Sequence, residues 1–319
     1  MKPSDLAKRR SSHVCVFGDP KTGKSTLVAK LLLSGFHLTW ISMDNGHEVI
    51  FKLGIPMEVL DTQLSVVVIP DTKENPIAIG TVRKILTGSP QEICDLHGAV
   101  GCSTCRQNKR SFTRICLSEF GSKDILVLDH GGQISDSCMN VITIKKNDEY
   151  KYEWDDYNAQ GSVLAGLMMN IQQSKANIIM ITHVTESEME DGKKKLLPMM
   201  GTRNFSRNVG KYFDHLIYCE MSSGSHKFGS STTYKASVMT GSRTDISIEK
   251  DKEASLVPFF DGSIPPQEEQ GTFAVKKVLD IKVPEKDEFV VEEVVPAPAP
   301  APVQTTSRTA LLAQLTGKK

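Results

Sequence analysis

The stretch Gly18-Asp19-Pro20-Lys21-Thr22-Gly23-Lys24-Ser25 decides the fold of this chain, because it matches the pattern G-x-x-x-x-G-K-[ST]. It follows the apolar run Val14–Phe17 and leads into the helical run Thr26–Leu33. Glycines let such a loop curl so that backbone N–H groups point at phosphate oxygens, and the helix start adds its positive dipole end. Lys24 would reach the β- and γ-phosphates and Ser25 would hold Mg²⁺. The stretch therefore predicts an ATP and Mg²⁺ site over residues 18–26; a glycine-rich turn with an incidental lysine is the alternative.

Short apolar runs rich in Val, Ile and Leu alternate with helical patterns along most of the chain. The strand-like runs are Val14–Phe17, Thr39–Met43, Leu64–Ile69, Ile125–Leu128, Ile178–Thr182 and Leu216–Cys219. We expect helices at Lys24–Leu33 and Gly161–Gln173, and an edge or antiparallel strand at Tyr234–Thr240. This alternation predicts an α/β fold, with a mostly parallel sheet covered by helices on both faces.

A carboxylate closes the run Ile125–Leu128, since the next residue is Asp129. This arrangement places Asp129 beside the magnesium-bound phosphates, as the partner of Ser25. The following residue is His130, where many ATPases of the AAA+ class carry a glutamate that polarises the attacking water. Hydrolysis therefore needs another group to orient that water.

We expect Asp44 to supply that group, because it follows the run Thr39–Met43 and ligands bind at the carboxyl ends of parallel strands. Glu48 is the reserve, and a plain turn at Asp44-Asn45-Gly46 is the alternative. At the end of Ile178–Thr182, Thr182 and His183 would lie beside the γ-phosphate, where they would sense it and pass the change to the next loop.

Four metal-type ligands fall within twelve residues, as Cys94-x-x-His97 and Cys102-x-x-Cys105. Three thiolates and one imidazole complete a tetrahedral Zn²⁺ shell with no open position, so we predict a structural zinc knuckle inserted at about residues 90–116. Unrelated buried cysteines are the alternative. The basic residues that follow would face nucleic acid or a neighbouring subunit, or form a solvated flank; they are Arg106, Lys109, Arg110 and Arg114.

Two further stretches, Lys145–Tyr157 and Lys193–Lys211, mix basic and aromatic side chains. Cations that follow phosphates, interleaved with rings on which bases stack, are what a single-stranded DNA surface requires. An ordinary surface loop is the alternative for each stretch. The predicted DNA-binding residues are Lys151, Trp154, Arg203, Phe205, Arg207 and Lys211.

The charge balance of the 319 residues is zero, with 38 basic and 38 acidic side chains. Five acidic residues and one lysine fall in Pro284–Val295, so the remainder is slightly basic. The neutral total therefore does not exclude a polyanionic ligand. We expect that removing the chain from Pro284 onward tightens DNA binding and makes it more dependent on salt.

Composition also divides the chain. We expect an N-terminal arm at 1–12, an ATPase core at 13–262, an acidic and Pro/Ala-rich linker at 263–303 and a docking peptide at 304–319. The leucines of that peptide would bind a single-strand-binding or replication protein, or it is simply a frayed terminus. No apolar run reaches eighteen residues and no secretory h-region is present, so a cytoplasmic protein with no membrane contact is expected.

With these residues assembled, the chain resembles the RecA-like recombinase ATPases, in particular the phage-encoded branch of single-strand annealing or recombination ATPases. The resemblance rests on Gly18–Ser25, Asp44-Asn45-Gly46, Ile125–Asp129, Thr182-His183 and the later segments Phe213-Asp214-His215 and Gly241-Ser242-Arg243-Thr244. It implies ATP bound between subunits of a ring or filament, in the host cytosol. It also implies a basic finger that reaches the neighbouring subunit's phosphates, here Arg243 with Lys227 and Lys235 behind it.

The favoured hypothesis is a DNA-dependent ATPase that binds single strands in recombination, annealing or replication. A hexameric replicative-type helicase shares the same core and is distinguished by unwinding of a forked substrate. A small-molecule P-loop kinase would show hydrolysis that ignores DNA. A nucleotide-gated scaffold without catalysis is the remaining alternative, favoured if Asp44 is too short to act.

Overall fold

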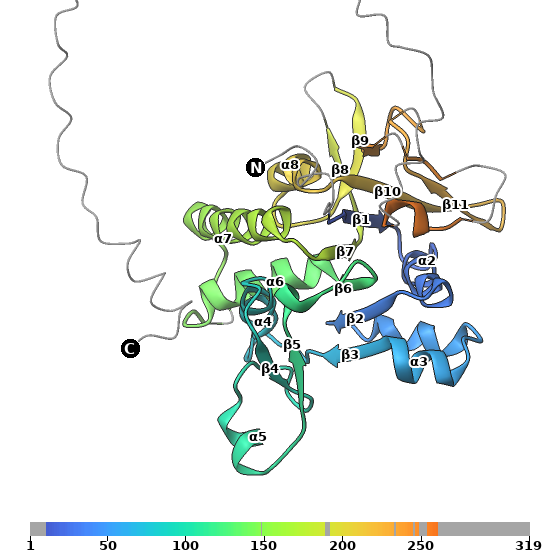
Figure 1. Cartoon of the computed structure of the whole chain (residues 1–319). Helices are drawn as coiled ribbons and strands as arrows, with labels where there is room; N and C mark the ends of the chain where they lie inside the picture. Colours follow the sequence, from blue (N-terminus) through green and yellow to red (C-terminus); the bar gives the residue numbers. More distant parts are fainter. Residues whose placement is uncertain are drawn as a thin grey trace, which may run out of the picture. The chain divides into compact units, whose positions relative to one another are not determined.

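The computed structural model describes residues 11–260, except 148, 189–191, 233, 245 and 249–253. Eight strands form the central sheet: β1 (His13–Gly18), β2 (His37–Ser42), β3 (Leu64–Val68), β6 (Asp124–Asp129), β7 (Asn177–Thr182), β10 (His215–Ser222), β11 (Ser225–Gly229) and β12 (Gly241–Ser242). Their order is β11-β10-β1-β7-β6-β2-β3, with β12 attached to β10 (Figure 1). All neighbouring pairs from β10 to β3 are parallel, and β11 and β12 are antiparallel to β10. The predicted mostly parallel sheet is confirmed.

Helices cover both faces of the sheet (Figure 1). One face carries α4 (Ala78–Ile85), α6 (Gly131–Thr143) and α7 (Trp154–Gln173), and the other carries α2 (Lys24–Ala29) and α3 (Met57–Gln63). Short 3-10 turns extend these layers: η1 (Lys30–Ser34), η2 (Gly46–Lys52), η3 (Leu117–Glu119), η4 (Gly210–Tyr212) and η5 (Val257–Phe259).

Side chains of each central strand alternate between the two cores, as the two-residue period of a strand requires. On β1, Cys15 and Phe17 face the core beneath α4, α6 and α7, whereas Val14 and Val16 face the core beneath α2 and α3. All four are fully buried. Burial on both faces explains why these strands are continuous apolar runs in the sequence.

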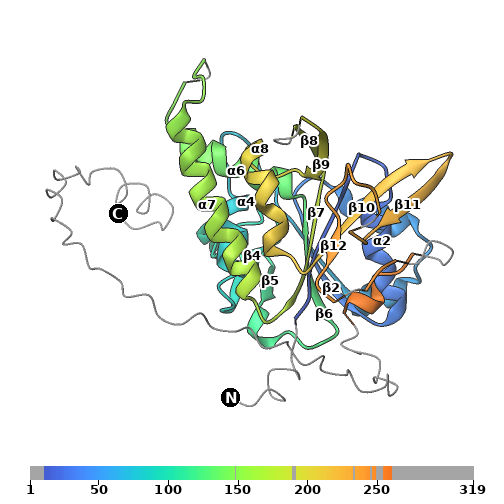
Figure 2. The ribbon, with the colours of Figure 1, turned by 90° about the horizontal axis from the view of Figure 1, so that it is seen from above.

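Two small antiparallel hairpins and two short helices lie outside the sheet. They are β4 (Gln91–Cys94) with β5 (Phe112–Ile115), β8 (Val184–Glu188) with β9 (Lys194–Pro198), α5 (Ser103–Gln107) and α8 (Arg203–Val209). In Figure 1, β4, β5 and α5 project from the sheet as a separate lobe, and Figure 2 shows β8 and β9 on the same side as the start of α7.

The strand predicted at Tyr234–Thr240 is wrong. Only Val238 pairs there, in an isolated bridge to Leu196. The reason is that β11 occupies the edge beside β10, while the Tyr234 ring packs on Gly229 of that edge and its hydroxyl donates to Glu220 at 2.8 Å. This segment therefore covers the edge through side chains instead of extending the sheet.

The predicted linker and docking peptide, and residues 1–10 of the predicted arm, lie outside the described residues. Within the described part, none of the helices has the length and apolar character needed to cross a membrane.

Candidate nucleotide site and cysteine cluster

The phosphate loop joins β1 to α2 and is held in a curled shape by its own groups. Gly18 is required there, because a Cβ atom would lie 2.0 Å from the carbonyl oxygen of Cys219 on β10. The Thr22 hydroxyl donates to the carbonyl of Asp19 at 2.8 Å, and Gly23 takes a φ of 87° at the start of α2. Residues 18–26 thus form the loop-to-helix turn that the sequence predicts, with Ser25 and Thr26 half-buried in the first turn of the helix.

Lys24 lies across this loop instead of pointing to solvent. Its Nζ donates to the carbonyls of Gly18 at 3.0 Å and Asp19 at 2.7 Å, and the residue is 7% exposed. Burial lowers the pKa of the Lys24 ammonium, while the nearby carboxylates of Asp129 and Asp44 act in the opposite direction. The charge is therefore already positioned among the backbone groups that would surround a phosphate.

Asp129 ends β6 in a buried position and accepts a hydrogen bond from Trp40 Nε1 of β2 at 3.1 Å. A Cβ atom at Gly46 would lie 2.7 Å from Asp129 Oδ2 and 2.9 Å from Asp44 Oδ1, so both carboxylates adjoin the same glycine. Burial, followed by the Asp44 charge, raises the pKa of Asp129 to about 7. Two acidic groups that adjoin the same glycine, near the charge of Lys24, are suited to a divalent cation with bound water.

Asp44 is exposed and forms the turn at Asp44-Asn45-Gly46 that was the alternative interpretation of the sequence. Its Oδ1 accepts from the Gly46 backbone N–H at 2.9 Å, and Asn45 between them takes a φ of 62°. Glu48 is exposed in the first turn of η2. The structure thus brings Asp44 to Asp129 but places Glu48 on the surface.

Two histidines end the neighbouring strands β6 and β7. The rings of His130 and His183 lie 4.1 Å apart at 60°. Burial, followed by the effect of His183, lowers the pKa of His130 to about 4, and burial followed by the charge of Lys24 lowers the pKa of His183. Among the described residues, neither ring nitrogen of His130 has a hydrogen-bond partner, and neither does Nδ1 of His183.

The end of β7 is tied to β9 by two hydrogen bonds. The Thr182 hydroxyl donates to the Met199 carbonyl at 2.6 Å, and the Met199 N–H donates to the His183 carbonyl at 2.8 Å. The next residue, Met200, donates its N–H to the hydroxyl of Ser206 on α8 at 3.0 Å. A continuous set of contacts therefore runs from the phosphate edge of the sheet to the β8–β9 hairpin and α8.

The four predicted metal ligands come together on the projecting lobe. The ligand atoms of Cys94, His97, Cys102 and Cys105 all lie within 4.8 Å of one another. His97 Nδ1 is 3.5 Å from Cys102 Sγ and 3.2 Å from Cys105 Sγ. With bonds of about 2.0–2.3 Å, ligands of a tetrahedral zinc are separated by roughly 3.5–4 Å, so this donor set fits Zn²⁺. The cluster would hold the metal through protein ligands alone.

The cluster is anchored to the sheet through its own linking residues. Gly98, with a φ of 63°, is pressed against β3: a Cβ atom would lie 2.7 Å from the Val68 carbonyl oxygen. The Gly98 carbonyl accepts from the Thr81 hydroxyl of α4 at 3.0 Å. Ile93, directly before Cys94, is fully buried in the main core. The metal-type cluster and the edge of the sheet therefore share one packed interior.

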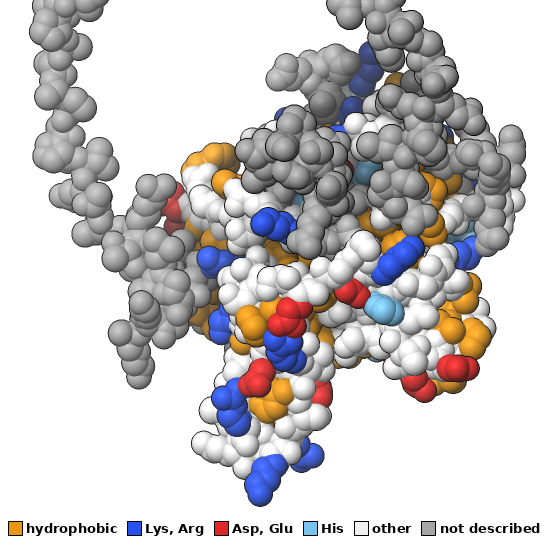
Figure 3. All heavy atoms as spheres, viewed as in Figure 1, with side chains coloured by type: hydrophobic (Ala, Val, Ile, Leu, Met, Phe, Trp, Pro, Cys, Tyr) orange, Lys and Arg blue, Asp and Glu red, His pale blue; other side chains and the backbone are white. Residues whose placement is uncertain are grey.

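Basic side chains gather on this lobe, with acidic ones among them (Figure 3). Arg106 pairs with Glu92 at 2.6 Å, and Arg114 forms two hydrogen bonds of 2.6 Å with Glu119. Both arginines are thus engaged locally. Lys109 and Arg110 are exposed at the end of the lobe.

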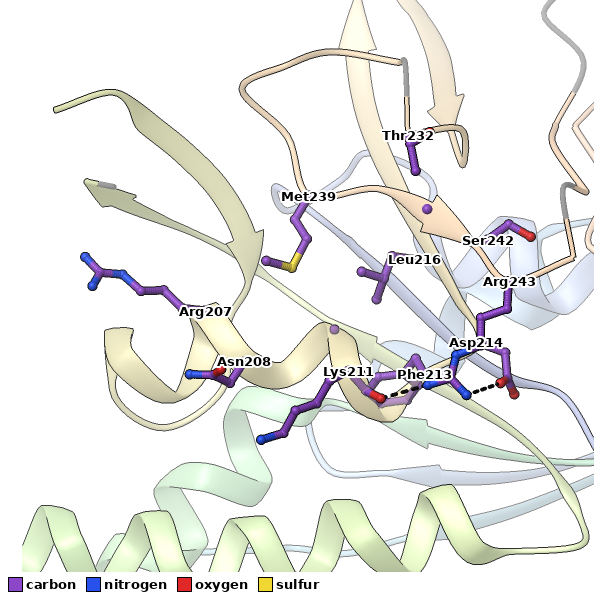
Figure 4. A pocket seen from close by; sticks show the side chains of 12 residues that line it. Arg207, Asn208, Lys211, Phe213, Asp214, Leu216, Thr232, Met239, Ser242 and Arg243 are labelled. Carbon is purple, nitrogen blue, oxygen red and sulfur yellow. Dashed lines mark hydrogen bonds and ion pairs between the residues drawn. The ribbon is translucent and has the colours of Figure 1, made fainter. Parts of the chain in front are cut away.

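Arg243, the predicted finger, lies at the far end of β10 from the phosphate loop. It contacts Asp214 at 3.2 Å and the Lys211 carbonyl at 2.9 Å, beside a cavity of about 380 Å³ (Figure 4). The loop begins at Gly18, which pairs with Cys219 further along β10, whereas Arg243 follows Ser242, the partner of the first residue of the strand. Arg243 is therefore remote from the phosphates of its own chain. The two other candidates for the finger are engaged within the chain. Lys235 Nζ pairs with Glu220 at 2.6 Å, and Lys227 Nζ donates to Ser222 at 3.1 Å.

The first predicted DNA stretch leads into α7. Trp154 starts this helix and is 77% exposed, and Lys151 just before it is exposed. The rings of Tyr152 and Tyr157 lie 6.1 Å apart beside them. All three aromatic side chains are exposed. The start of α7 lies on the side of the ribbon from which the β8–β9 hairpin also projects (Figure 2).

The second predicted DNA stretch forms β9, α8 and η4. Arg203 and Lys211 are exposed, whereas Phe205 packs against the main core. Arg207 Nε donates to the Ser187 hydroxyl of β8 at 2.8 Å, and its guanidinium also bonds the Glu188 carbonyl. Phe205 is thus placed for packing and Arg207 for bracing the hairpin, while Arg203 and Lys211 are open to a ligand.

The fold and the loop together define a P-loop nucleotide-binding protein of the α/β class. A family model described as an AAA domain matches residues 10–245, and the chain belongs to that family. Among solved structures, the crystal structure of the RadB recombinase aligns at 14% identity with a TM-score of 0.36, covering 69% of this chain and 87% of that chain. No curated protein matches the sequence.

Sequence reasoning missed Trp40 as a partner of Asp129 and left His130 without a role. Trp40 lies two positions before Ser42, which is paired in register with Asp129, but this pairing becomes visible only when β2 and β6 are neighbours. The sequence offered one signal for this contact, a tryptophan within an apolar run, and the structure shows that this tryptophan is fully buried.

Proposed function

We propose that the protein is an ATPase that binds ATP and Mg²⁺ at the phosphate loop and couples hydrolysis to single-stranded DNA. The observation that supports it best is the convergence of Lys24, Asp129 and Asp44, which follow or end the parallel strands β1, β6 and β2 at their carboxyl ends. Bound Mg²⁺ would neutralise charge on the phosphates, held by Ser25 and Asp129. Asp44 supplies a second carboxylate on the same side, beside the metal-bound water.

The coupling is proposed to pass through β7 and β9. A change at the phosphate edge would move Thr182 and His183, and both are bonded to Met199. Met199 continues into Met200 and α8, where Arg203 is exposed, and then into η4, where Lys211 is exposed. Single-stranded DNA would lie over α8 and the start of α7, with Lys151 and Arg203 along the phosphates and Trp154 stacking on a base. Lys211 would contact the strand further on, because its carbonyl accepts from Gln172 at the other end of α7.

Self-assembly into a ring or filament is part of the proposal, because Arg243 lies far from the phosphates of its own chain and would act on those of a neighbour. Zinc is proposed to hold the cysteine cluster closed as a structural ion. We propose that this DNA-dependent ATPase acts in recombination, annealing or replication of DNA, in a phage or elsewhere. A single-strand-binding or replication protein is the proposed partner of the C-terminal peptide.

The decisive experiment is ATP hydrolysis with and without single-stranded DNA at low salt. Lys24→Ala and Asp129→Ala should each lower the rate by about 100-fold or more, since they remove charges aimed at the transferred phosphate. Lys52→Ala, an exposed lysine at the end of η2, is the matched control. A rate that ignores DNA would refute the DNA-dependent function, and hydrolysis that survives Lys24→Ala would refute the site.

The DNA surface has its own test. Trp154→Ala should weaken binding of single-stranded DNA by about 5- to 100-fold, the range for loss of one stacked base. Met169→Ala removes another exposed apolar side chain of α7, at 48% exposure, and should leave the affinity unchanged. Equal affinities of both variants in a fluorescence-anisotropy titration would exclude Trp154 from the surface.

A further inference from the structure

His130 is a buried histidine whose hydrogen-bonding groups are left unused by the fold. It is 5% exposed, and neither of its ring nitrogens has a partner among the described residues. A neutral imidazole carries one N–H donor and one acceptor nitrogen, and burying such groups unpaired costs free energy. The fold treats His215 differently, because this buried histidine shares a hydrogen bond of 2.9 Å between its Nδ1 and Ser242. The unpaired nitrogens of His130 therefore favour a hydrogen-bond partner that is not part of the described residues, such as a water or a ligand.

The surroundings hold the His130 ring rigidly. The ring of His183 lies against it at 4.1 Å. On the other side is Gly132, where a Cβ atom would lie 2.8 Å from His130 Cε1 and 2.7 Å from Met199 Cε. A side chain larger than glycine would displace one of these neighbours, so the second residue of α6 leaves room for the ring. The ring is therefore enclosed by its neighbours with both nitrogens shielded from solvent, and a bound nucleotide must shift one of these neighbours before a nitrogen can meet water.

The place is the phosphate edge of the sheet. His130 directly follows Asp129 at the end of β6, and its ring contacts His183, which follows Thr182 at the end of β7. The first residue of α6, Gly131, packs on Thr182, with 3.2 Å between its Cβ position and the Thr182 hydroxyl oxygen. The His130 ring thus lies between the end of β6 and the end of β7, at the edge of the sheet from which the phosphate loop leaves β1.

Asp44 is less suited to orient water than its position in sequence suggested. One of its carboxylate oxygens accepts from the Gly46 N–H, and the side chain is exposed. His130 is buried and has its acceptor unused. Catalytic groups that hold a water work best where bulk solvent is excluded and the group need not reorganise.

We propose that His130 is the catalytic residue that orients the attacking water in ATP hydrolysis, an inference that rests on the proposed ATPase function. When bound nucleotide has uncovered the ring, its acceptor nitrogen receives a hydrogen bond from the water, which directs the water oxygen at the γ-phosphorus. The new bond joins that oxygen to phosphorus, and the bond from phosphorus to the bridging oxygen of ADP breaks. The water proton passes to an oxygen of the phosphate product, so the imidazole is neutral before and after. His183 acts as the positioning residue that fixes the ring.

The test compares variants of the full chain in ATP hydrolysis and nucleotide binding. His130→Phe keeps the ring but removes both nitrogens, and should lower kcat about 100-fold with little change in KM. His130→Gln, which keeps an acceptor and a donor, should recover part of the rate. His37→Phe makes the same change at the start of β2, at the opposite end of the strands, where the ring contacts Asp124, and should leave kcat unchanged.

A second readout separates orientation of water from support of the fold. ADP with aluminium fluoride imitates the transferred phosphate with its water, and its affinity should fall in His130→Phe, while a non-hydrolysable ATP analogue binds as in the wild type. His130→Phe should keep its melting temperature, because the nitrogens it removes have no partner to lose. If His130→Phe fails to fold, the rate and analogue affinities of His130→Gln decide.

The outcomes distinguish this inference from the proposed function. Wild-type hydrolysis that is lost in Lys24→Ala but retained in His130→Phe overturns the role of His130 alone. A wild-type protein that binds ATP without hydrolysing it also overturns that role. A wild-type protein that binds no nucleotide overturns the proposed function itself.

Discussion

The phosphate loop and the cysteine cluster are both short glycine-containing motifs, yet they depend on the rest of the chain in different ways. The cluster takes all its ligand atoms from residues 94–105. The phosphate site takes Lys24 from one segment, Asp129 from another and a close backbone contact from Cys219, two hundred residues away. A local motif can therefore assemble its chemistry alone, whereas the phosphate site exists only after the sheet has formed.

Loss of the metal should have the largest effect and would test whether the cluster is independent. Cys105→Ser removes a ligand that is 1% exposed and should destabilise the protein by about 4 kcal/mol, the range reached when a structural metal is lost. Metal analysis should find about one zinc per wild-type chain and far less in the variant. Cys116→Ser, a buried cysteine outside the cluster, should keep the zinc. Equal zinc contents in the two variants would show that the cluster is no metal site.

The pH dependence of stability should report on the phosphate site. The pKa of Asp129 is raised in the fold, so the folded chain binds a proton that the unfolded chain has released. Stability without Mg²⁺ is therefore full below pH 4 and falls by roughly 2–4 kcal/mol as the pH rises through about 7. Asp129→Asn should remove this slope in thermal melts between pH 4 and 8. A wild-type slope that persists in the variant would assign the effect to another group.

An effect of comparable size is expected where the cluster touches the sheet. Gly98→Ala places a methyl group against the backbone of β3 and should cost about 2–4 kcal/mol, because backbone cannot move aside. Gly101→Ala is the matched control, since Gly101 has a similar φ of 68° and nothing within 4 Å of its Cβ position. Its cost should be limited to backbone strain of about 1 kcal/mol. Equal midpoints for the two variants in urea would mean that the contact with β3 carries no energy.

The smallest effect should come from Trp40. Trp40→Phe keeps the ring in the core but removes the N–H donated to Asp129, and should destabilise the protein by about 1 kcal/mol at pH 8. Near pH 4 the Asp129 carboxyl is protonated and gains less from the Trp40 N–H, so the difference in stability between the variant and the wild type should shrink. Urea unfolding of the variant and wild type at both pH values measures it; a difference independent of pH would point to packing instead of the hydrogen bond.

The sequence was informative wherever a few adjacent residues carry the chemistry. The loop at Gly18–Ser25, the ligands Cys94–Cys105 and the six parallel strands follow from local patterns, and the structure contains them. It was uninformative about pairing between distant segments. The contact of Trp40 with Asp129 depends on which strands are neighbours, and the ring pair of His130 and His183 depends on two strand ends meeting.

Short amphipathic elements were also hard to predict. The hairpin of β8 and β9 has few residues and carries a lysine run, so its charge pattern favoured a loop. The segment Tyr234–Thr240 contains residues typical of strands, but the ring of Tyr234 packs against Gly229 of β11. In both places a contact from outside the segment decided its conformation.

The chain contains only two tryptophans, and they lie at opposite extremes of exposure. Trp40 is fully buried against Asp129, and Trp154 is 77% exposed at the start of α7. The protein thus carries two tryptophan fluorophores in distinct environments. The emission of Trp40, buried beside Asp129, is expected to be blue-shifted relative to that of Trp154, which is in water. Replacing either with phenylalanine leaves a single emitter, so events at the phosphate edge and at the aromatic surface become separable by colour in the same molecule.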